Sequence, residues 1–235
     1  MQLFYHPRLD NSASQFVLDE QESGHMIKVL RKKEGDIFQV TNGKGYMFTA
    51  KIIVPNPKKC KAEIISTTKR PSKMYHFHLV VAPTKSNDRF EWFLEKATEI
   101  GVDEITPIIC ERSERKLIKK ERMQKVIQSA MKQSVQAFLP KLNDAIPFKE
   151  FIEQPQDGLR FIAHCDEEEK LELKRRVAPD KDITVLIGPE GDFSRNEIDQ
   201  AYGKGFLPVS LGPNRLRTET AAIVACTTVN MINNG

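Results

Sequence analysis

The chain has 235 residues, of which 40% are hydrophobic and 29% charged, and its formal net charge is +4. This composition is typical of a folded soluble chain rather than a disordered one, and no apolar run approaches the roughly 18 residues that would suggest a membrane span. The first residues lack the basic segment and apolar stretch of a secretion signal. We therefore expect a cytoplasmic protein that has no membrane partner.

The charge is unevenly distributed along the chain. Residues 1–72 hold 12 Lys and Arg against 7 Asp and Glu, whereas residues 73–235 hold 24 against 25. A polyanion such as RNA would therefore meet the N-terminal part first. The four cysteines are far apart and form no C-x-x-C pair, so we expect free thiols rather than disulfides or a zinc site: Cys60, Cys110, Cys165 and Cys226.

Residues 1–72 have the pattern of a small β-barrel domain. A helix is predicted over residues 19–30, and β-rich segments follow at 36–41, 46–54 and 60–68. The segment Asn42-Gly43-Lys44-Gly45 predicts a hairpin turn, because such turns need residues that tolerate a positive φ. Short strands separated by turns favour a barrel, and residues 69–73 are interpreted as a linker.

The pattern changes after the linker. Strands are predicted at residues 76–82, 104–109, 159–164, 184–187 and 208–211, and helices at 88–100, 121–137, 194–202 and 218–233. Gly101 is expected to end the first of these helices. Alternating strands and helices predict an α/β domain over residues 73–235, with a mainly parallel sheet covered on both faces.

Two junctions between a strand and a helix carry unusual loops. In the first, Val185–Ile187 leads into Gly188-Pro189-Glu190-Gly191-Asp192-Phe193, and Ser194 with Glu197 fits a capping box. Glycine lets backbone groups approach a ligand closely, and ligands of α/β sheets bind at the carboxyl ends of strands. The alternative is a tight structural turn.

In the second junction, Leu211-Gly212-Pro213-Asn214 is followed by Arg215, Arg217 and Glu219 and then by a helix rich in small residues. This could be a surface salt-bridge cluster. However, arginine at a helix N-terminus opposes the helix dipole, and an unfavourably placed charge is a reason to expect function.

Several common sites are absent from the sequence. It has no P-loop, no G-x-G-x-x-G fingerprint and no G-x-S-x-G elbow. His76 and His78 share one strand face, but no third ligand lies nearby in sequence, so we expect no metal. His164, at a strand end, is of more interest, although most such histidines only cap or pack.

The two junctions together resemble the RsmE family, which methylates N3 of a uridine in 16S ribosomal RNA. The resemblance rests on Gly188–Ser194, Leu211-Gly212 and Leu216-Arg217-Thr218-Glu219-Thr220-Ala221. It extends to Leu30-Arg31, Gly35-Asp36 and the 42–45 turn, which resemble the family's PUA-like domain. Lys85, Arg89 and residues 96–102 resemble the first helix of its catalytic domain, so the resemblance covers essentially the whole chain.

The resemblance implies a PUA-like RNA-binding domain over 1–72 and a SPOUT methyltransferase domain over 73–235, with a trefoil knot, S-adenosylmethionine as cofactor and a homodimer. It implies a cofactor site made of Ala163, His164, Ile187, Gly188, Pro189, Glu190, Gly191, Leu211, Gly212, Asn214, Leu216, Arg217 and Thr220. The expected RNA contacts are Arg8, Arg31, Lys32, Lys33, Lys85 and Arg89.

Two residue sets depart from the family's pattern. Asp192 stands where the family commonly has glycine, and Lys132-Gln133-Ser134-Val135-Gln136 stands where it often has Glu-Gln-Ser-x-Arg. The first adds a negative charge beside the cofactor loop, and the second removes an acid and a base.

In the expected mechanism, Arg217 stabilises the negative charge that develops on the uridine carbonyls, and Glu219 accepts the N3 proton or orients Arg217. Three other functions compete with this one. They are a SPOUT enzyme acting on another RNA position, a non-catalytic RNA-binding or ribosome-assembly factor, and a small-molecule methyltransferase, which would leave the basic N-terminal domain unexplained.

Overall fold

The computed structural model describes residues 2–166 and 169–234. The chain forms two compact units. The first contains residues 1–72 together with 128–139, and the second contains residues 73–127 together with 140–235. Within the described residues, no helix has the length and apolar character that crossing a membrane would require.

The first unit is built around a five-stranded sheet in the order β1-β3-β4-β5-β2, in which only β1 and β3 pair in parallel. Its elements are β1 (Leu3–Tyr5), β2 (Gln15–Val17), α1 (Glu20–Gly24), the π-helical turn η1 (His25–Val29), β3 (Ile37–Thr41), β4 (Tyr46–Val54) and β5 (Lys61–Lys69). Alternating apolar residues of the strands enclose a core that includes Phe4, Phe38, Phe48 and Ile52.

The predicted hairpin at residues 42–45 is confirmed, since β3 and β4 pair antiparallel on either side of it. The positive φ falls on Gly43 and Gly45, at 71° and 92°. Gly45 is also required by packing, because a Cβ there would lie 2.6 Å from the Phe138 ring. The same turn receives residues 137–139, through bonds such as the one that Gly45 N–H donates to the Ala137 carbonyl at 2.9 Å. This contact explains why residues 128–139 cluster with the first unit.

The second unit contains an entirely parallel sheet in the order β11-β13-β10-β12-β6-β7-β8, with β9 also paired to β7. Its strands are β6 (Phe77–Val81), β7 (Glu104–Ile109), β8 (Lys141–Leu142), β9 (Ile146–Pro147), β10 (Leu159–Ala163), β11 (Leu171–Glu172), β12 (Ile183–Ile187) and β13 (Leu207–Ser210). The predicted mainly parallel sheet is therefore confirmed.

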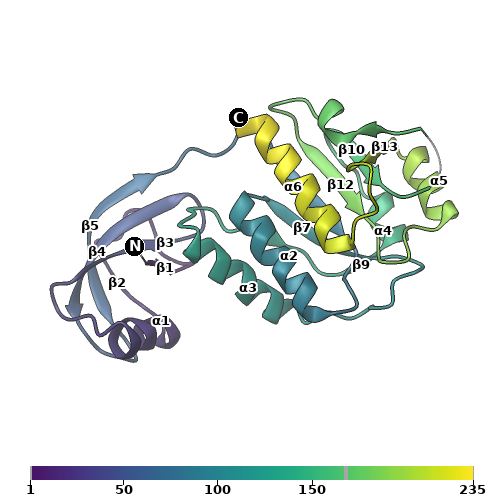
Figure 1. The fold of residues 1–235 in the computed structure, drawn as a ribbon. Coiled ribbons are helices and arrows are strands. Elements are labelled where there is room, and N and C mark those ends of the chain that lie inside the picture. Colours follow the sequence, from purple (N-terminus) through teal and green to yellow (C-terminus); the bar gives the residue numbers. More distant parts are fainter. Residues whose placement is uncertain (1, 167–168, 235) are drawn as a thin grey trace. The chain divides into compact units, whose positions relative to one another are not determined.

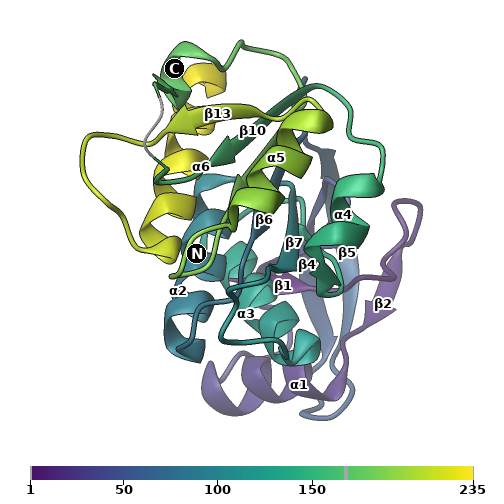
Figure 2. The same cartoon turned by 90° about the vertical axis from the view of Figure 1, so that its right-hand side faces the viewer.

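Helices cover this sheet on both faces, α2 and α6 on one and α4 and α5 on the other (Figure 2). The helical elements are α2 (Asn87–Ile100), α3 (Lys120–Gln133), α4 (Phe148–Glu153), the 3-10 turn η2 (Leu173–Arg175), α5 (Arg195–Gly203) and α6 (Thr218–Asn234). Gly101 ends α2 with φ 115°, as predicted. Helix α3 begins in the second unit and ends in the first.

Helices α4 and α5 are held on the sheet by apolar side chains that pack against side chains of the strands. Phe148 and Phe151 of α4 and Ile198 of α5 pack against Val80 and Leu186 of the central strands. These positions alternate along β6 and β12, as expected for residues that point to one face of a sheet. The strand ends of this sheet carry the loops that form the candidate site (Figure 1).

Candidate active site

A cleft lies at the carboxyl ends of three neighbouring strands, β13, β10 and β12. It consists of two adjoining pockets of about 260 and 480 Å³. The pockets share the lining residues Ala163, Cys165, Arg215, Leu216 and Ala221. Because parallel strands end at one edge of the sheet, three loops that are distant in sequence meet here.

Most of the residues predicted to hold a cofactor line this cleft. The smaller pocket contains Ala163, Ile187, Gly188, Pro189, Glu190, Leu216 and Arg217, and the larger one contains Ala163, His164, Leu211, Gly212, Asn214 and Leu216. Gly191 and Thr220 do not belong to either lining. The prediction omitted several neighbours that do: Cys165, Asp166, Lys170, Asp192, Val209, Ser210, Pro213, Arg215, Thr218 and Ala221.

The glycine loop after β12 is fixed by close packing. A Cβ on Gly188 would lie 3.0 Å from the Phe193 ring, and one on Gly191 would lie 3.2 Å from Cβ of Arg112. The Arg112 guanidinium donates to the Gly191 carbonyl at 3.0 Å, and the Thr218 hydroxyl donates to the Gly188 carbonyl at 3.0 Å. A side chain at either glycine would therefore crowd its neighbours, and two hydrogen bonds hold the loop in this conformation.

The helix that follows begins as predicted. The Ser194 side chain accepts from the Glu197 backbone N–H, and the Glu197 carboxylate accepts from the Ser194 N–H at 2.8 Å. Glu197 also accepts from the N–H of Glu111 at 2.8 Å, so its carboxylate ties the loop after β7 to the same place. The capping box thus fixes both the helix start and the neighbouring loop.

Asp192 joins two of the three loops. Its carboxylate accepts from the Cys165 N–H at 2.7 Å and from the Phe193 N–H at 2.8 Å. Its φ of 63° is left-handed, a conformation in which glycine is free of strain and Asp is better tolerated than most residues. The departure noted in the sequence is therefore a side chain that bridges the loop after β10 to the loop after β12.

Lys170 stabilises the loop after β10 by hydrogen bonds to backbone carbonyls of the same loop. Its ammonium donates to the His164 carbonyl at 2.9 Å and to the Asp166 carbonyl. The buried His164 ring pairs with the Tyr202 hydroxyl of α5 at 2.8 Å. Hydrogen bonding of His164 thus favours a positioning role in the wall of the larger pocket.

Two arginines project from the loop after β13. Arg215 is exposed and its guanidinium lies 3.5 Å from the Glu190 carbonyl. Arg217 is also exposed and lines the smaller pocket, and its guanidinium has no hydrogen-bond or ion-pair partner among residues 2–166 and 169–234. Arg217 is therefore a cation at the edge of the cleft that remains available to a ligand.

Glu219 and Arg217 have different surroundings, although they are only two positions apart in the sequence. It is 7% exposed and forms an ion pair of 3.8 Å with Arg89 of α2, and its Oε2 is buried without a hydrogen-bond partner. It does not line either pocket of the cleft. The structure thus places Glu219 against Arg89, one of the predicted RNA contacts, rather than on the cleft wall.

The other predicted RNA contact of the second unit, Lys85, lies beside the glycine loop. Its backbone N–H donates to Glu190 at 2.9 Å, and its ammonium pairs with Glu114 at 2.8 Å. Lys85 is exposed. Lys85 and Arg89 are therefore both linked to residues of the two motif segments.

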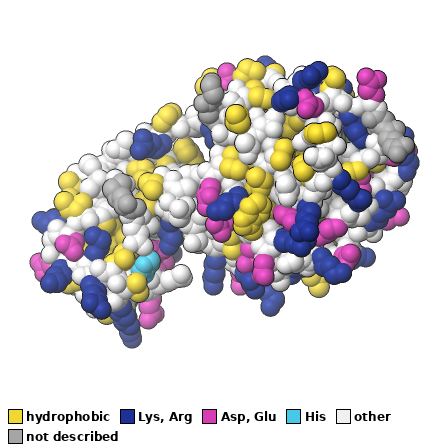
Figure 3. All heavy atoms as spheres, viewed as in Figure 1, with side chains coloured by type: hydrophobic (Ala, Val, Ile, Leu, Met, Phe, Trp, Pro, Cys, Tyr) yellow, Lys and Arg dark blue, Asp and Glu magenta, His cyan; other side chains and the backbone are white. Residues whose placement is uncertain are grey.

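The four predicted contacts of the first unit lie on its surface. Arg8, Arg31 and Lys33 are exposed and their side chains have no partner among the described residues, whereas Lys32 donates to the Ile37 carbonyl at 3.2 Å. Arg31 has a left-handed φ of 54° and follows Leu30, the residue that caps the C-terminus of η1. On the face drawn in Figure 3, Lys and Arg side chains recur across this unit.

Comparison with known proteins identifies the class. A model of the RNA methyltransferase domain matches residues 70–230, and a model of the RNA methyltransferase PUA domain matches residues 18–65. The chain is 33% identical to ribosomal RNA small subunit methyltransferase E of Buchnera aphidicola, over 93% of this chain and 88% of that protein.

Two solved structures are similar over nearly their whole length. A probable rRNA methyltransferase from Porphyromonas gingivalis has a TM-score of 0.91 and 40% identity, and covers 99% of this chain and 98% of its own. A ribosomal RNA small subunit methyltransferase E from Neisseria gonorrhoeae, bound to S-adenosylmethionine, has a TM-score of 0.85 and 27% identity, with 99% and 98% covered.

The fold, the cleft and these matches define an RNA methyltransferase with a PUA domain. Within that class, the chain belongs to the ribosomal RNA small subunit methyltransferase E family. The predicted family is thereby confirmed.

Proposed function

We propose that this protein transfers a methyl group from S-adenosylmethionine to N3 of one uridine near the 3′ end of 16S ribosomal RNA, in the decoding region of the small subunit. The observation that carries the proposal is a cleft at three adjoining strand ends with the unpartnered Arg217 at its edge. In this proposal the protein is cytoplasmic and dimeric, and its three cleft loops belong to a trefoil knot.

The residues of the cleft fit the proposed cofactor. Ala163, Ile187, Leu211, Leu216 and Ala221 give apolar walls, and the loops around them expose backbone groups that could hydrogen-bond an adenine. A Cβ at Gly212 would meet no atom within 4 Å, so the cleft is open there. When bound, S-adenosylmethionine would supply an activated methyl group on a sulfonium.

The protein's own contribution is positioning and charge. Uridine N3 lies between two carbonyls, so loss of its proton spreads negative charge over both oxygens. Arg217 is the candidate catalytic cation for that charge, because it is exposed at the cleft and has no competing partner in the described chain. Holding N3 in line with the methyl carbon would contribute several kcal/mol more.

For Glu219, the observed contacts support a role that differs from the two expected ones, which were acceptance of the N3 proton and orientation of Arg217. The Glu219 carboxylate is buried, contacts the Arg89 guanidinium of α2 and does not line the cleft. An ion pair of this kind would fix the orientation of the Arg89 side chain. We therefore propose that Glu219 positions Arg89 toward the RNA. A role of Glu219 as the proton acceptor stays a prediction.

The first unit would bind RNA phosphates through Arg8, Arg31, Lys32 and Lys33. The target uridine must leave its stack for N3 to reach the cleft. A folded ribosomal particle rather than a short oligonucleotide is the expected substrate, since a base already unpaired in that particle requires the least unstacking.

The test uses purified protein, labelled S-adenosylmethionine and small subunits from cells that lack this methyltransferase. Digestion of the RNA and mass spectrometry should reveal N3-methyluridine at a single position. Methylation of a ribose or of another base would support a different member of the enzyme class. Absence of both methyl transfer and cofactor binding would instead favour a non-catalytic assembly factor.

A further inference from the structure

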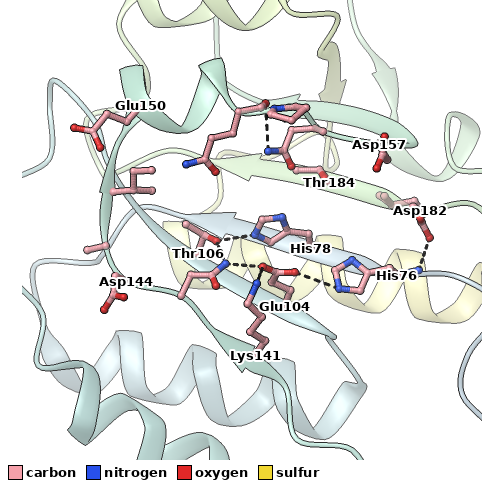
Figure 4. Close-up of a pocket in the computed structure, with 17 residues that line it drawn as sticks. His76, His78, Glu104, Thr106, Lys141, Asp144, Glu150, Asp157, Asp182 and Thr184 are labelled. Atoms are coloured by element: carbon pink, nitrogen blue, oxygen red, sulfur yellow. Dashed lines mark hydrogen bonds and ion pairs between the residues drawn. The ribbon is translucent and has the colours of Figure 1, made fainter.

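A second pocket, of about 660 Å³, lies at the opposite edge of the parallel sheet, where β6, β7 and β12 begin (Figure 4). Its lining includes His76 and His78 from β6 and its approach, Glu104 and Thr106 from β7, and Thr184 from β12. The cofactor cleft lies at the carboxyl ends of the strands, so this pocket is separate from it and shares none of its residues.

The sheet face that forms the pocket floor is polar at the start of the strands and apolar further along them. In register, Thr184 pairs with His78, and Leu186 pairs with Val80. Successive residues alternate between faces, so His78 and Val80 point to one side, as do Thr184 and Leu186. Helix α4 packs on the apolar half through Phe148 and Phe151. The polar half is where the cavity lies.

Polar side chains in this position are unusual. Strands in the middle of a parallel sheet are normally apolar on both faces, yet His78, Thr106 and Thr184 are 8%, 3% and 4% exposed. A departure of this kind from the expected pattern is a reason to look for a ligand.

Part of the floor is internally satisfied. The His78 ring is hydrogen-bonded to the Thr106 hydroxyl at 2.7 Å, and the Asn143 amide donates to Thr106 at 2.7 Å and to Glu104 at 2.6 Å. Burial is the main reason that the pKa of His78 is lowered to about 4, so its ring is neutral at pH 7. Lys141 pairs with Glu104 at 2.8 Å.

The Thr184 hydroxyl is not satisfied in this way. Thr184 lines the pocket, and no described residue forms a hydrogen bond with its side chain. The hydroxyl is not one of the solvent-inaccessible side-chain atoms that lack a partner, so it faces the cavity, where water or a ligand would provide its hydrogen bond. The floor therefore offers a hydrogen-bonding group to an occupant of the cavity.

The charge of the lining decides the kind of occupant. Five carboxylates line the pocket: Glu104, Asp144, Glu150, Asp157 and Asp182. Two of them are already paired with lysines, Glu104 with Lys141 of the lining and Asp144 with Lys120 outside it. Figure 4 shows Asp144, Glu150, Asp157 and Asp182 around the polar floor. Glu150 and Asp157 have no ion-pair partner in the described chain. On a chain of net charge +4, the unpaired carboxylates make this pocket locally negative, which disfavours a polyanion such as RNA and favours a cation.

A compact metal ion is a poorer match than an extended cation. Within the described residues, no group of three or more His, Cys, Asp and Glu side chains is arranged to hold a metal. The carboxylates instead come from separate elements, namely the segment before β9, helix α4, the turn before β10 and the turn before β12. A chain of ammonium groups could reach several of them at once.

We propose that this pocket binds a linear polyamine, an organic cation with two or more ammonium groups. One ammonium would lie near Thr184 on the floor, and the others would be held by Glu150 and Asp157. Because the attraction is electrostatic and partly exposed, added salt would weaken it. This site is independent of the proposed methyl transfer.

Isothermal titration calorimetry of the full chain with spermidine tests the proposal. Saturable binding of one spermidine per chain is expected, and the double variant Glu150→Gln, Asp157→Asn should weaken it about fivefold to tenfold. Thr184→Val, which keeps the size and the β-branch, should weaken it about threefold with an unchanged circular dichroism spectrum. Glu121→Gln, an exposed charge change on α3 outside the pocket, is the matched control and should bind normally.

Binding that is not saturable, or that falls equally in the double variant and in Glu121→Gln, would overturn the proposal. Displacement of spermidine by Mg²⁺ more strongly than by Na⁺ at equal ionic strength would overturn the choice of an organic cation. Arg217→Ala should bind spermidine normally, so failure of the proposed methyl transfer and failure of this site would be told apart.

Discussion

The carboxylate of Asp192 accepts a hydrogen bond from the backbone N–H of Cys165 at 2.7 Å, and this bond joins two loops of the cleft. The two residues are 27 positions apart, and both line the smaller pocket. The bond fixes the loop after β10 relative to the glycine loop. The shape of the proposed cofactor site therefore depends on a side chain rather than on backbone packing alone.

Removing this bond should weaken cofactor binding. Asp192→Ala loses a charge-assisted hydrogen bond worth about 1.5 to 3 kcal/mol, so the dissociation constant for S-adenosylmethionine should rise about tenfold or more by calorimetry. Asp192→Asn keeps an acceptor oxygen in the same place and should lose much less. Equal affinities in the wild type and Asp192→Ala would contradict the role.

The reactivity of the Cys165 thiol gives a second measurement on the same variants, because Cys165 is the one exposed cysteine of the four. Burial first, and the Asp192 charge second, raise the pKa of its thiol. Alkylation by iodoacetamide at pH 8 should therefore be faster in both variants, because both remove the charge. A further increase in Asp192→Ala alone would report the loosened loop.

Arg217 should act in the chemical step more than in cofactor binding. Arg217→Ala should lower kcat about 100-fold, as expected for the loss of one donor to a developing oxyanion. Its affinity for S-adenosylmethionine should stay within about threefold of the wild type, because the cleft walls remain. Arg217→Lys keeps the charge and should recover part of the rate. A nearly normal rate in Arg217→Ala would exclude this role.

Lys132 of α3 forms a largely buried ion pair with Glu22. Lys132 lies 2.5 Å from Glu22, and the two side chains are 23% and 9% exposed. The second oxygen of Glu22 has no hydrogen-bond partner. Removal of the lysine would leave a buried carboxylate unpaired, so Lys132→Ala should destabilise the first unit by roughly 2 to 4 kcal/mol in denaturant unfolding.

Two further variants separate the charge effect from lost packing. Glu22→Gln in combination with Lys132→Met removes both charges and should recover most of the stability. Lys125→Ala, an exposed position on the same helix, should change stability by less than about 0.5 kcal/mol. If Lys125→Ala cost as much as Lys132→Ala, helix propensity rather than the ion pair would be the cause.

Long, clearly bounded elements could be predicted from the sequence. Strands β4 and β7 have the predicted bounds, because alternating or apolar runs end at turn residues. Strands β1 and β2, of three residues each, and the six-residue α4 were not predicted. Such short segments complete no hydrophobic period, and only tertiary packing selects their conformation.

The site was predicted to a similar depth. The sequence predicted strand ends at residues 164, 187 and 211, close to the observed ends at 163, 187 and 210, and the family resemblance implied that the loops after them meet. The direction of each side chain could not be predicted, because residues 221–226 of α6 are six consecutive apolar residues that mark no single buried face. The rotation of the helix is instead set by its packing on α2. Thr218 and Ala221 consequently line the cleft, while Glu219 contacts Arg89. No pattern in the sequence predicted that Asp192 would bond to Cys165.

The cations after η1 should bind RNA phosphates. Reversing Arg31 and Lys33 to Glu should lower the affinity for small-subunit RNA and reduce the slope of log K against log salt by about 1 per lost contact. Lys51→Glu is not a neutral control, because Lys51 pairs with Glu63. Lys125→Glu on α3 serves better, since it is exposed and lies outside the first unit. An unchanged salt slope in the double variant would contradict RNA docking at these residues.

Stability should fall as the pH is lowered from 7 to 5, because of His78. Its folded pKa is about 4, lowered mainly by burial, whereas the unfolded value is about 6.5. Between these values the unfolded chain binds more protons than the folded one, so the free energy of unfolding decreases with decreasing pH. The loss from pH 7 to pH 5 should be about 2 kcal/mol.

Denaturant unfolding followed by the fluorescence of Trp92, the one tryptophan, measures this in the second unit. His78→Gln cannot titrate in this range, so most of the decrease between pH 7 and pH 5 should disappear, even if the variant is less stable at both. Burial would raise the pKa of Glu104, but hydrogen bonds from Lys141 and Asn143 lower it overall. Its contribution is therefore lost only below about pH 4.5, outside the chosen window. An equal pH dependence in His78→Gln and the wild type would show that another group titrates instead.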